Sequence, residues 1–381
     1  MNKVYVIKCP DYKQVDEKMD MLLSMMGGMD QFAKAGERIV LKPNLLVPKK
    51  PENAITTHPA VVAAVGRITK SVGASPIIAD TPGSAFPYNK KGLDRVYRMC
   101  GMSEVADESG IEVNLDTTWK TVSFPEGNLI KRFEVITPVI KADGVFNLCK
   151  LKTHGFMSMT GAVKNSFGVI PGIIKAGYHA KLQDVRNFAC MCLDLSEYVS
   201  PRISIMDAVI GMEGNGPQNG APRHIGLLLA SRSPLALDIV AGEIMGLDRE
   251  NNPLLIEAEK RGLSPNHFEQ VEVVGAYKSD LCIPDFKLPA TLNAGASSFA
   301  MSVLIPLFKN WITVRPEIIK DKCAACGICS DACPVNVISV DNNYAQINRK
   351  KCIRCYCCHE MCPQDAIKLR SSFLYRIVNR I

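Results

Sequence analysis

The sequence lacks the features that would export the protein or anchor it in a membrane. None of its apolar runs reaches the roughly 18 residues that a membrane-spanning helix needs, and the best candidate, residues 299–307, is too short. The first ten residues have neither the apolar run nor the small-residue cleavage site of a secretory signal. We therefore expect a cytoplasmic protein without a transmembrane segment.

Two common nucleotide-binding signatures are also missing. No G-x-G-x-x-G follows the first apolar run, and no G-x-x-x-x-G-K-[ST] occurs, so we predict neither a nicotinamide site nor a nucleoside triphosphate site. A flavin or an additional metal is left open, because flavin sites share no single fingerprint. The net charge of +7, from 45 basic and 38 acidic residues, is too small to indicate nucleic-acid binding.

Most of the chain alternates short apolar runs with helical patterns. The predicted strands are residues 4–7, 38–41, 76–79, 203–206, 225–230 and 271–274, and the predicted helices are residues 15–33, 59–72 and 234–246. Short apolar strands separated by helices are typical of βαβ units around a parallel sheet. Residues 111–145 have a strand-rich pattern that favours an antiparallel insertion. The fold class is therefore α/β, with a mostly parallel sheet and flanking helices.

Cysteine, by contrast, is abundant, with fifteen in the chain and nine of them from Cys323 to Cys362. In a reducing compartment such clustering indicates metal binding rather than disulfides. The spacing C-x₂-C-x₂-C-x₃-C-P occurs twice, beginning at Cys323 and at Cys352, an offset of 29 residues. Such a run wraps three corners of a [4Fe-4S] cube, whereas zinc sites prefer paired C-x₂-C arms from separate segments. The doubled motif predicts two [4Fe-4S] clusters.

This segment resembles the bacterial two-cluster ferredoxins, in which the cysteine before the proline ligates the other cluster. The resemblance implies cluster I on Cys323, Cys326, Cys329 and Cys362, and cluster II on Cys352, Cys355, Cys358 and Cys333. The ninth cysteine, Cys357, is opposite Ile328 in the other repeat, so we predict that it is not a ligand. Gly327 gives the first loop a permissive backbone. The second loop has Tyr356 there, a departure that predicts strain or burial.

Composition sets the predicted domain boundaries. At roughly 100–200 residues per domain, a chain of this length has two or three domains. The α/β domain spans residues 1–300, and a linker of changed composition spans residues 301–312. The small α+β ferredoxin-like domain spans residues 313–371, followed by a basic amphipathic tail at residues 372–381.

Polar residues follow the apolar runs where strands of the predicted sheet should end. Because parallel strands present their carboxyl ends at one edge, where open α/β sheets bind ligands, we expect these side chains to share one crevice. The candidate catalytic residues are His154, Lys152, Lys164 and Asp207, and the candidate cofactor-binding residues are Lys42, Asn44, Asp80, Asn165 and Glu213. The lysines would attract an anion, and His154 would donate a proton near neutral pH. Taken singly, the lysines also fit solvated strand ends, the aspartates fit caps, and His154 fits a packed polar residue.

A second resemblance covers roughly residues 35–250. Five segments carry it: LKPNL at 41–45, ADTPG at 79–83, LKTH at 151–154, TGAVKNSFG at 160–168 and GMEGNGP at 211–217. They are similar, in this order, to the motifs of the family called domain of unknown function 362. Members of that family often carry the same two-cluster appendage. The resemblance implies this organisation and a redox context, without a particular reaction.

Together the modules predict an oxidoreductase in which two [4Fe-4S] clusters pass electrons to an anionic substrate or cofactor in the crevice. The alternative is a non-catalytic electron carrier or cluster-delivery protein that uses the α/β domain for docking. Either function needs a redox partner protein, such as a ferredoxin, a flavodoxin or a reductase. A small anionic molecule is the other expected partner, and nucleic acid is not expected.

Crossed ligation predicts the effect of single cysteine substitutions. Iron and acid-labile sulfide should each be about eight per chain after anaerobic preparation, since two cubes hold that many. Cys333→Ala should lose the cluster of the second loop and Cys362→Ala that of the first, each halving the iron content. Cys357→Ala should keep both. Loss of a cluster in Cys357→Ala, or a wild-type protein that holds only zinc, would contradict the assignment.

Overall fold

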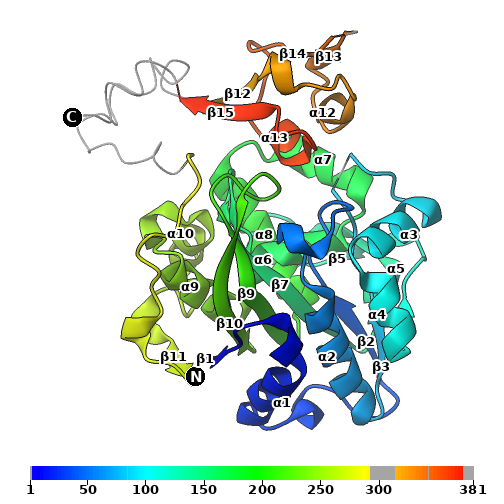
Figure 1. Cartoon of the computed structure of the whole chain (residues 1–381), viewed down its shortest axis with the longest axis vertical. Coiled ribbons are helices and arrows are strands. Elements are labelled where there is room, and N and C mark those ends of the chain that lie inside the picture. The colour runs from blue at the N-terminus through cyan, green and yellow to red at the C-terminus, as the bar shows by residue number, and fades with distance from the viewer. Residues whose placement is uncertain (1, 84, 292–313, 342, 372–381) are drawn as a thin grey trace.

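A mixed sheet of nine strands forms the centre of the larger domain (Figure 1). The computed structural model of the chain describes residues 2–83, 85–291, 314–341 and 343–371. Eight strands follow the order β11-β1-β10-β9-β7-β2-β3-β4, and β8 pairs with β7. Within this order β10 alone is antiparallel to its neighbours, so the predicted α/β fold with a mostly parallel sheet is confirmed. The strands are β1 (Lys3–Lys8), β2 (Arg38–Lys42), β3 (Ser75–Ile78), β4 (Glu112–Val113), β7 (Gly144–His154), β8 (Ser158–Met159), β9 (Ile203–Glu213), β10 (Ala221–Ser231) and β11 (Glu272–Val274).

Two hydrophobic cores, one on each face of the sheet, hold the helices in place. Ile39 and Leu41 of β2 face one core and Val40 faces the other, as the two-residue period of a strand requires. Helices α1 (Val15–Met25), α2 (Pro59–Ser71), α3 (Lys90–Met99) and α4 (Met102–Ser109) pack on the first core, and α6 (Gly161–Asn165), α8 (Val185–Val199), α9 (Pro234–Ile244) and α10 (Pro253–Lys260) on the second. None of the helices in the described ranges is long and apolar enough to cross a membrane.

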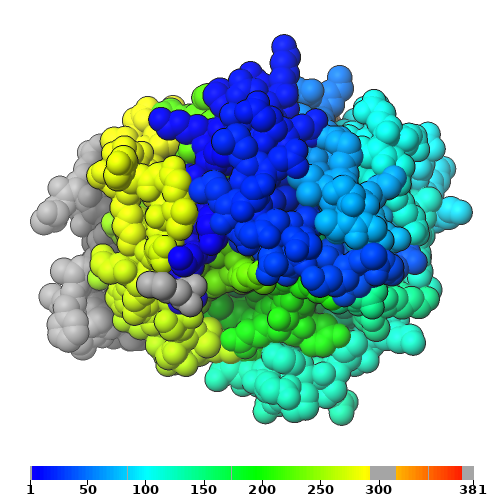
Figure 2. All heavy atoms as spheres, turned by 90° about the horizontal axis from the view of Figure 1, so that it is seen from below, coloured from blue at the N-terminus to red at the C-terminus, as the bar shows by residue number. Residues whose placement is uncertain are grey.

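Two predicted segments differ in detail. The helix expected over residues 15–33 ends at Met25, because Gly27 and Gly28 adopt φ angles of 94° and 91° that break the helical backbone. Residues 111–145 do contain an antiparallel hairpin, β5 (Trp119–Ser123) with β6 (Arg132–Ile136), followed by α5 (Thr137–Ile140). Both ends of that stretch, however, join the main sheet as β4 and the start of β7. Figure 2 views the molecule from below and shows the blue N-terminal segment beside the yellow one, in keeping with the β1–β11 pairing.

The internal repeat of the C-terminal module is visible in its backbone. The first repeat contains α12 (Ile328–Asp331) and the second α13 (Cys357–Met361), and two strand pairs flank them: β12 (Val314–Ile318) with β15 (Ile367–Ser371), and β13 (Ile338–Val340) with β14 (Ala345–Ile347). Left-handed residues recur at the 29-residue offset, as Ala325 and Arg354, Gly327 and Tyr356, and Asn336 and Asp365. The predicted linker 301–312 and tail 372–381 lie outside the described residues.

The second repeat docks on the α/β domain (Figure 1). Asn219 Nδ2 donates to the carbonyl of His359 at 2.9 Å, and Gln218 Nε2 donates to that of Cys362 at 3.2 Å. Tyr356, strained at φ 60°, is half-buried, with its ring edge-on to Phe156 at a centroid distance of 6.4 Å. This contact offsets part of the cost of a left-handed non-glycine residue.

Asp238 on α9 fixes the short helix that carries two site residues. Its carboxylate accepts hydrogen bonds from the backbone N–H of Ala162 and, at 2.9 Å, of Val163, which have no partner within the first turn of α6. Gly161 adopts a φ of 60°, and a Cβ there would lie 2.3 Å from Asp238 Oδ1. The carboxylate thus requires glycine at position 161 and sets the direction of α6.

Removal of this cap should weaken the fold. Asp238→Ala leaves two buried N–H groups without an acceptor, which costs roughly 2–4 kcal/mol and should lower the thermal midpoint by several degrees. Asp20→Ala, at an exposed position of α1, should leave the midpoint unchanged. Equal midpoints for the two variants in calorimetry would show that Asp238 does not hold α6.

Candidate functional site

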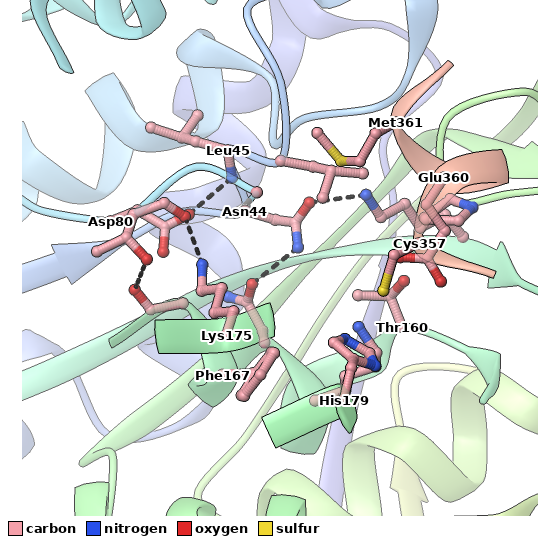
Figure 3. A pocket seen from close by; sticks show the side chains of 18 residues that line it. Asn44, Leu45, Asp80, Thr160, Phe167, Lys175, His179, Cys357, Glu360 and Met361 are labelled. Carbon is pink, nitrogen blue, oxygen red and sulfur yellow. Dashed lines mark hydrogen bonds between the residues drawn. The ribbon is translucent and has the colours of Figure 1, made fainter. Parts of the chain in front are cut away.

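A small pocket lies where the carboxyl ends of β2 and β3 meet the C-terminal module (Figure 3). Asn44 follows β2, Asp80 follows β3, and Lys152 lies near the end of β7. Helix α13 closes the other side with three side chains, those of Cys357, Glu360 and Met361. The cavity measures about 70 Å³, far below the roughly 300–1,000 Å³ of sites for drug-sized ligands. It suits a molecule of a few heavy atoms and is too small for a flavin.

Five of the nine predicted crevice residues line this pocket: Asn44, Asp80, Lys152, Lys164 and Asn165. Lys42 is buried and donates from Nζ to Asp80 Oδ1 at 2.9 Å. Asp80 Oδ2 accepts from the backbone N–H of Leu45 at 2.7 Å. A Cβ at Gly168 would lie 2.0 Å from Asp80 Oδ1. This ion pair therefore shapes the wall of the pocket. Both carboxylate oxygens of Asp80 already accept hydrogen bonds, so Asp80 is poorly suited to act as an acid or base.

Two predicted residues lie elsewhere, which corrects the expectation of a single crevice. Asp207 is buried against Lys150, whose Nζ lies 2.7 Å from Asp207 Oδ2, and it also accepts from the Tyr12 hydroxyl and the His58 backbone N–H. Glu213 accepts from the backbone N–H of Lys287 at 3.2 Å. Both residues belong to β9, which is separated from β2 by β7 and lies still farther from β3. Neither residue lines the pocket.

His154 is close to the pocket but suits a different role from the one predicted. Its Nδ1 accepts from the backbone N–H groups of Phe156 and Met157, at 3.1 and 3.2 Å, so the proton of the neutral ring is on Nε2. Burial lowers the pKa of His154 well below its usual value, and Lys164 and Lys152 lower it further. His154 is therefore neutral near pH 7. Its Nε2 faces Glu360 Oε1 at 3.4 Å across the boundary between the two modules.

Several lining residues were missed from the sequence. Lys175 and His179 come from α7 (Gly172–Lys181), Thr160 precedes α6, and Glu360 belongs to the C-terminal module. The position of strand ends does not point to them, because α7 follows a 3₁₀ turn and Glu360 lies more than 200 residues after β2, β3 and β7. The spacing of Lys175 and His179, four residues apart on one helix, was the available sign that they share a face.

A chain of amides holds the floor of the pocket rigid. Lys152 Nζ donates to Asn44 Oδ1 at 2.8 Å, and Asn44 Nδ2 donates to Asn165 Oδ1 at 3.0 Å. Asn165 Nδ2 in turn donates to Asn147 Oδ1 at 2.7 Å. Each amide is oriented by its neighbours, so the direction in which Lys152 presents its nitrogen is fixed by residues from the loop after β2, from α6 and from β7 together.

Three lysines give the pocket its electrostatic character. Burial lowers the pKa of Lys152 well below its usual value, with Lys164 and Lys150 lowering it further, and burial lowers the pKa of Lys175 to about 7. Lys175 Nζ donates to the carbonyls of Thr81 and Pro82, at 2.8 and 3.1 Å. Lys164 is half-buried and makes no hydrogen bond or ion pair with any described residue. The pocket therefore favours an anion.

Unsatisfied polar atoms surround the same space. Thr160 Oγ1, His179 Nδ1 and Glu360 Oε1 are buried without a hydrogen-bond partner among the described residues, although buried polar atoms are nearly always paired in native proteins. All three residues line the pocket. A bound molecule or ordered water would satisfy them, so the site is built for a polar occupant.

The cluster cysteines occupy positions that fit [4Fe-4S] cubes. Four of them, Cys323, Cys326, Cys329 and Cys362, line one small and otherwise apolar cavity. Burial raises the pKa of Cys352, and the thiols of Cys355 and Cys333 raise it further. These predicted ligands of cluster II therefore lie near one another as well. No three His, Cys, Asp or Glu side chains in the described ranges approach closely enough to hold a single ion.

Backbone donors to sulfur repeat with the motif. The N–H of Val337 points at Cys333 Sγ at 3.4 Å, and that of Ala366 points at Cys362 Sγ at 3.2 Å. Such bonds stabilise thiolates and help to set cluster potentials. Cys357 Sγ, by contrast, donates to the carbonyl of Cys355 at 3.9 Å and lines the α/β pocket. Crossed ligation, with Cys357 excluded, stays a prediction that this geometry suits.

An α/β domain whose polar pocket is closed by a ferredoxin-type module defines an iron–sulfur protein with an electron-carrying domain. Residues 315–363 match the profile of the 4Fe-4S dicluster domain. Residues 39–243, more than half of the chain, match the family described as Domain of unknown function (DUF362), and the chain belongs to this family.

Two known proteins are similar to the chain. The Thylakoid-associated protein sll1697 of Synechocystis sp. (strain ATCC 27184 / PCC 6803 / Kazusa) is 34% identical over 274 residues, covering 71% of this chain and 82% of the relative. The lactate racemase apoprotein from Thermoanaerobacterium thermosaccharolyticum has 10% sequence identity and a TM-score of 0.38, over 65% of this chain and 57% of the racemase chain, less than two thirds of that protein's length.

The affinity of the pocket for anions should fall as the pH rises. The ammonium of Lys175 loses its proton near pH 7, and burial raises the pKa of Glu360 to about 7, so a carboxylate forms over the same range. Both changes disfavour an anion. The association constant for acetate or sulfate, measured by calorimetry, should fall about tenfold or more from roughly pH 6 to 8.

Lys175→Gln should weaken binding at low pH and flatten this profile. Lys181→Gln, at the exposed end of the same helix, is the matched control and should behave like the wild type. A profile that rises with pH, or one that is the same in Lys175→Gln, would show that the anion does not bind beside Lys175.

Proposed function

We propose that the chain is an iron–sulfur oxidoreductase that reduces a small anionic molecule in the pocket between its two modules. When bound, [4Fe-4S] clusters supply electrons one at a time. Two clusters, each ligated in the crossed manner set out above, hold two electrons, which matches the needs of a two-electron reduction. A cytoplasmic location and a soluble redox partner complete the proposal.

One observation carries it: helix α13 belongs to both the cluster loop and the pocket. Cys358, a predicted ligand of cluster II, lies between Cys357 and Glu360, both of which line the pocket. On this one buried helix the ligand is therefore the direct neighbour of one pocket-lining residue and lies one residue away from another. Electron transfer falls steeply with distance, and this arrangement keeps the distance between cluster II and an occupant of the pocket short.

The other residues bind and orient the occupant. Lys164, which has no partner among the described residues, would hold a carboxylate or a similar oxyanion, and Lys152 and Lys175 would stabilise negative charge that develops during reduction. Thr160 and His179 would complete its hydrogen bonds. The protons needed for a two-electron reduction would come from Lys175 and Glu360, whose pKa values both lie at about 7.

Reoxidation of prereduced protein tests the proposal. The clusters are reduced anaerobically with a stoichiometric amount of dithionite, the excess is removed, and a panel of small carboxylates and other oxyanions is added. One class should restore the oxidised visible spectrum over many turnovers. Lys164→Gln should slow that reaction at least about tenfold, as loss of one charge contact to the transition state would, while Lys181→Gln should not.

The opposite pattern would favour the carrier or cluster-delivery function. If no small anion reoxidises the clusters above the background rate, while an acceptor protein does so equally fast in wild type and Lys164→Gln, the pocket takes no part in the reaction. Transfer of iron and sulfide to an apoprotein would identify cluster delivery.

A further inference from the structure

A second cavity lies beside the same cluster loop and has a different character. It measures about 420 Å³, is open to solvent, and four basic side chains line it: Arg315, Arg349, Lys350 and Arg354. None of the described residues that line it is acidic, and Cys352, a predicted ligand of cluster II, belongs to its wall. We call this cavity the basic groove.

Part of the charge of the basic groove is uncompensated among the described residues. Arg349 lies 3.4 Å from Glu317, and the same carboxylate also pairs with Arg370 at 3.0 Å. Lys350 is exposed and, like Arg354, forms no ion pair with the described part of the chain. Lys351, next in sequence, is exposed as well. Exposed charges of one sign that have no partner raise the local potential and steer charged molecules.

Balancing the negative charge of the clusters does not account for this surface by itself. An exposed ammonium such as that of Lys350 is screened by salt over about 8–10 Å, so it contributes little to a buried cluster. Arg354 sits between Cys352 and Cys355 and already lies against the cluster loop. The exposed lysines are therefore available to an approaching molecule rather than to the cluster.

We propose that the basic groove is the docking surface for an acidic one-electron carrier protein. Cys352 is half-buried in the wall of the groove, so a docked partner comes close to a predicted ligand of cluster II. The donor's reduced cofactor loses one electron, and the cluster gains that electron, without proton transfer. Electron transfer through the basic groove requires a cluster in this loop, but it does not depend on what the pocket binds.

The shape and surroundings of the groove favour a protein over a lipid surface. Its basic residues come from β12, from the turn after β14 and from the cluster loop, which makes a broad patch of the kind that small, charge-steered redox interfaces use. Membrane-binding surfaces add exposed aromatic or large aliphatic side chains. In the described part of the chain, every exposed large hydrophobic side chain belongs to the α/β domain: Met21, Met25, Met99, Trp119, Leu129 and Tyr277.

Charge reversal with a matched control tests the surface. The cluster-loaded full-length protein is titrated with oxidised flavodoxin, an acidic flavoprotein, in a calorimeter at low and at moderate salt. Lys350→Glu with Lys351→Glu should weaken binding about tenfold or more at low salt and reduce the salt dependence. Lys90→Glu with Lys91→Glu, two adjacent exposed lysines on α3, should bind like the wild type. Iron content verifies that each variant keeps its clusters.

A kinetic measurement separates docking from chemistry. Reduction of the clusters by photoreduced flavodoxin should slow in Lys350→Glu/Lys351→Glu, whereas reduction by the methyl viologen radical, a small cation, should not. Lys164→Gln should accept electrons from flavodoxin at the wild-type rate, so failure of the pocket proposal would leave this result unchanged. If cluster content falls in the double reversal, Lys350→Gln/Lys351→Gln provides the same test with a smaller effect.

Three results would overturn the proposal. Equal weakening by the two double reversals would show that only net charge matters. Wild-type protein that binds neither flavodoxin nor a [2Fe-2S] ferredoxin more tightly than it binds the basic protein lysozyme would exclude an acidic partner. Preferential, Lys350-dependent binding to phosphatidylcholine vesicles that contain phosphatidylglycerol would assign the groove to a membrane surface instead.

Discussion

Lysine side chains held out of water are the constraint on which the site depends. Lys42, Lys152 and Lys175 are buried, and an ammonium without hydrogen-bond partners in such a place costs several kcal/mol. Each is therefore met by acceptors: Asp80 for Lys42, Asn44 and a carbonyl for Lys152, and two carbonyls for Lys175. The loops after β2 and β3 supply all of these acceptors.

The same constraint explains why the C-terminal module docks where it does. Glu360 and the backbone of α13 cover the edge of the sheet that carries Lys152, Lys164 and Lys175. Burial there raises the pKa of Glu360 to about 7, although Lys164 and Lys152 act to lower it. The docked repeat also accepts hydrogen bonds from Gln218 Nε2 and Asn219 Nδ2 of the α/β domain. Interface and pocket are thus one structure, so a change in the docking of the module would also change the binding of an anion.

Seven residues of the second cluster loop connect the basic groove with the pocket. Cys352 at its start belongs to the basic groove, and Cys357, just before its last cysteine, belongs to the pocket. A partner docked at the groove and an anion held in the pocket would both be neighbours of cluster II. The first repeat also packs on the α/β domain, with Ala332 in one small hydrophobic cluster with Val47 and Ile55. Its Cys326 is exposed, which suits cluster I as a second store of charge or a second point of exchange.

The sequence by itself determined the features that depend on local covalent spacing. The C-x₂-C-x₂-C-x₃-C-P repeat, the apolar strands and the strand-end residues Asn44, Asp80 and Lys152 were all visible, because loop geometry and strand burial act over a few neighbouring residues. Tertiary structure alone decided which polar groups meet. Asp207 follows an apolar strand as Asp80 does, but it is buried against Lys150 and Tyr12. Glu360 and Lys175 enter the pocket only because α13 docks on the sheet edge and α7 packs beside it, and contacts between segments so distant in sequence are set by the packing of whole elements.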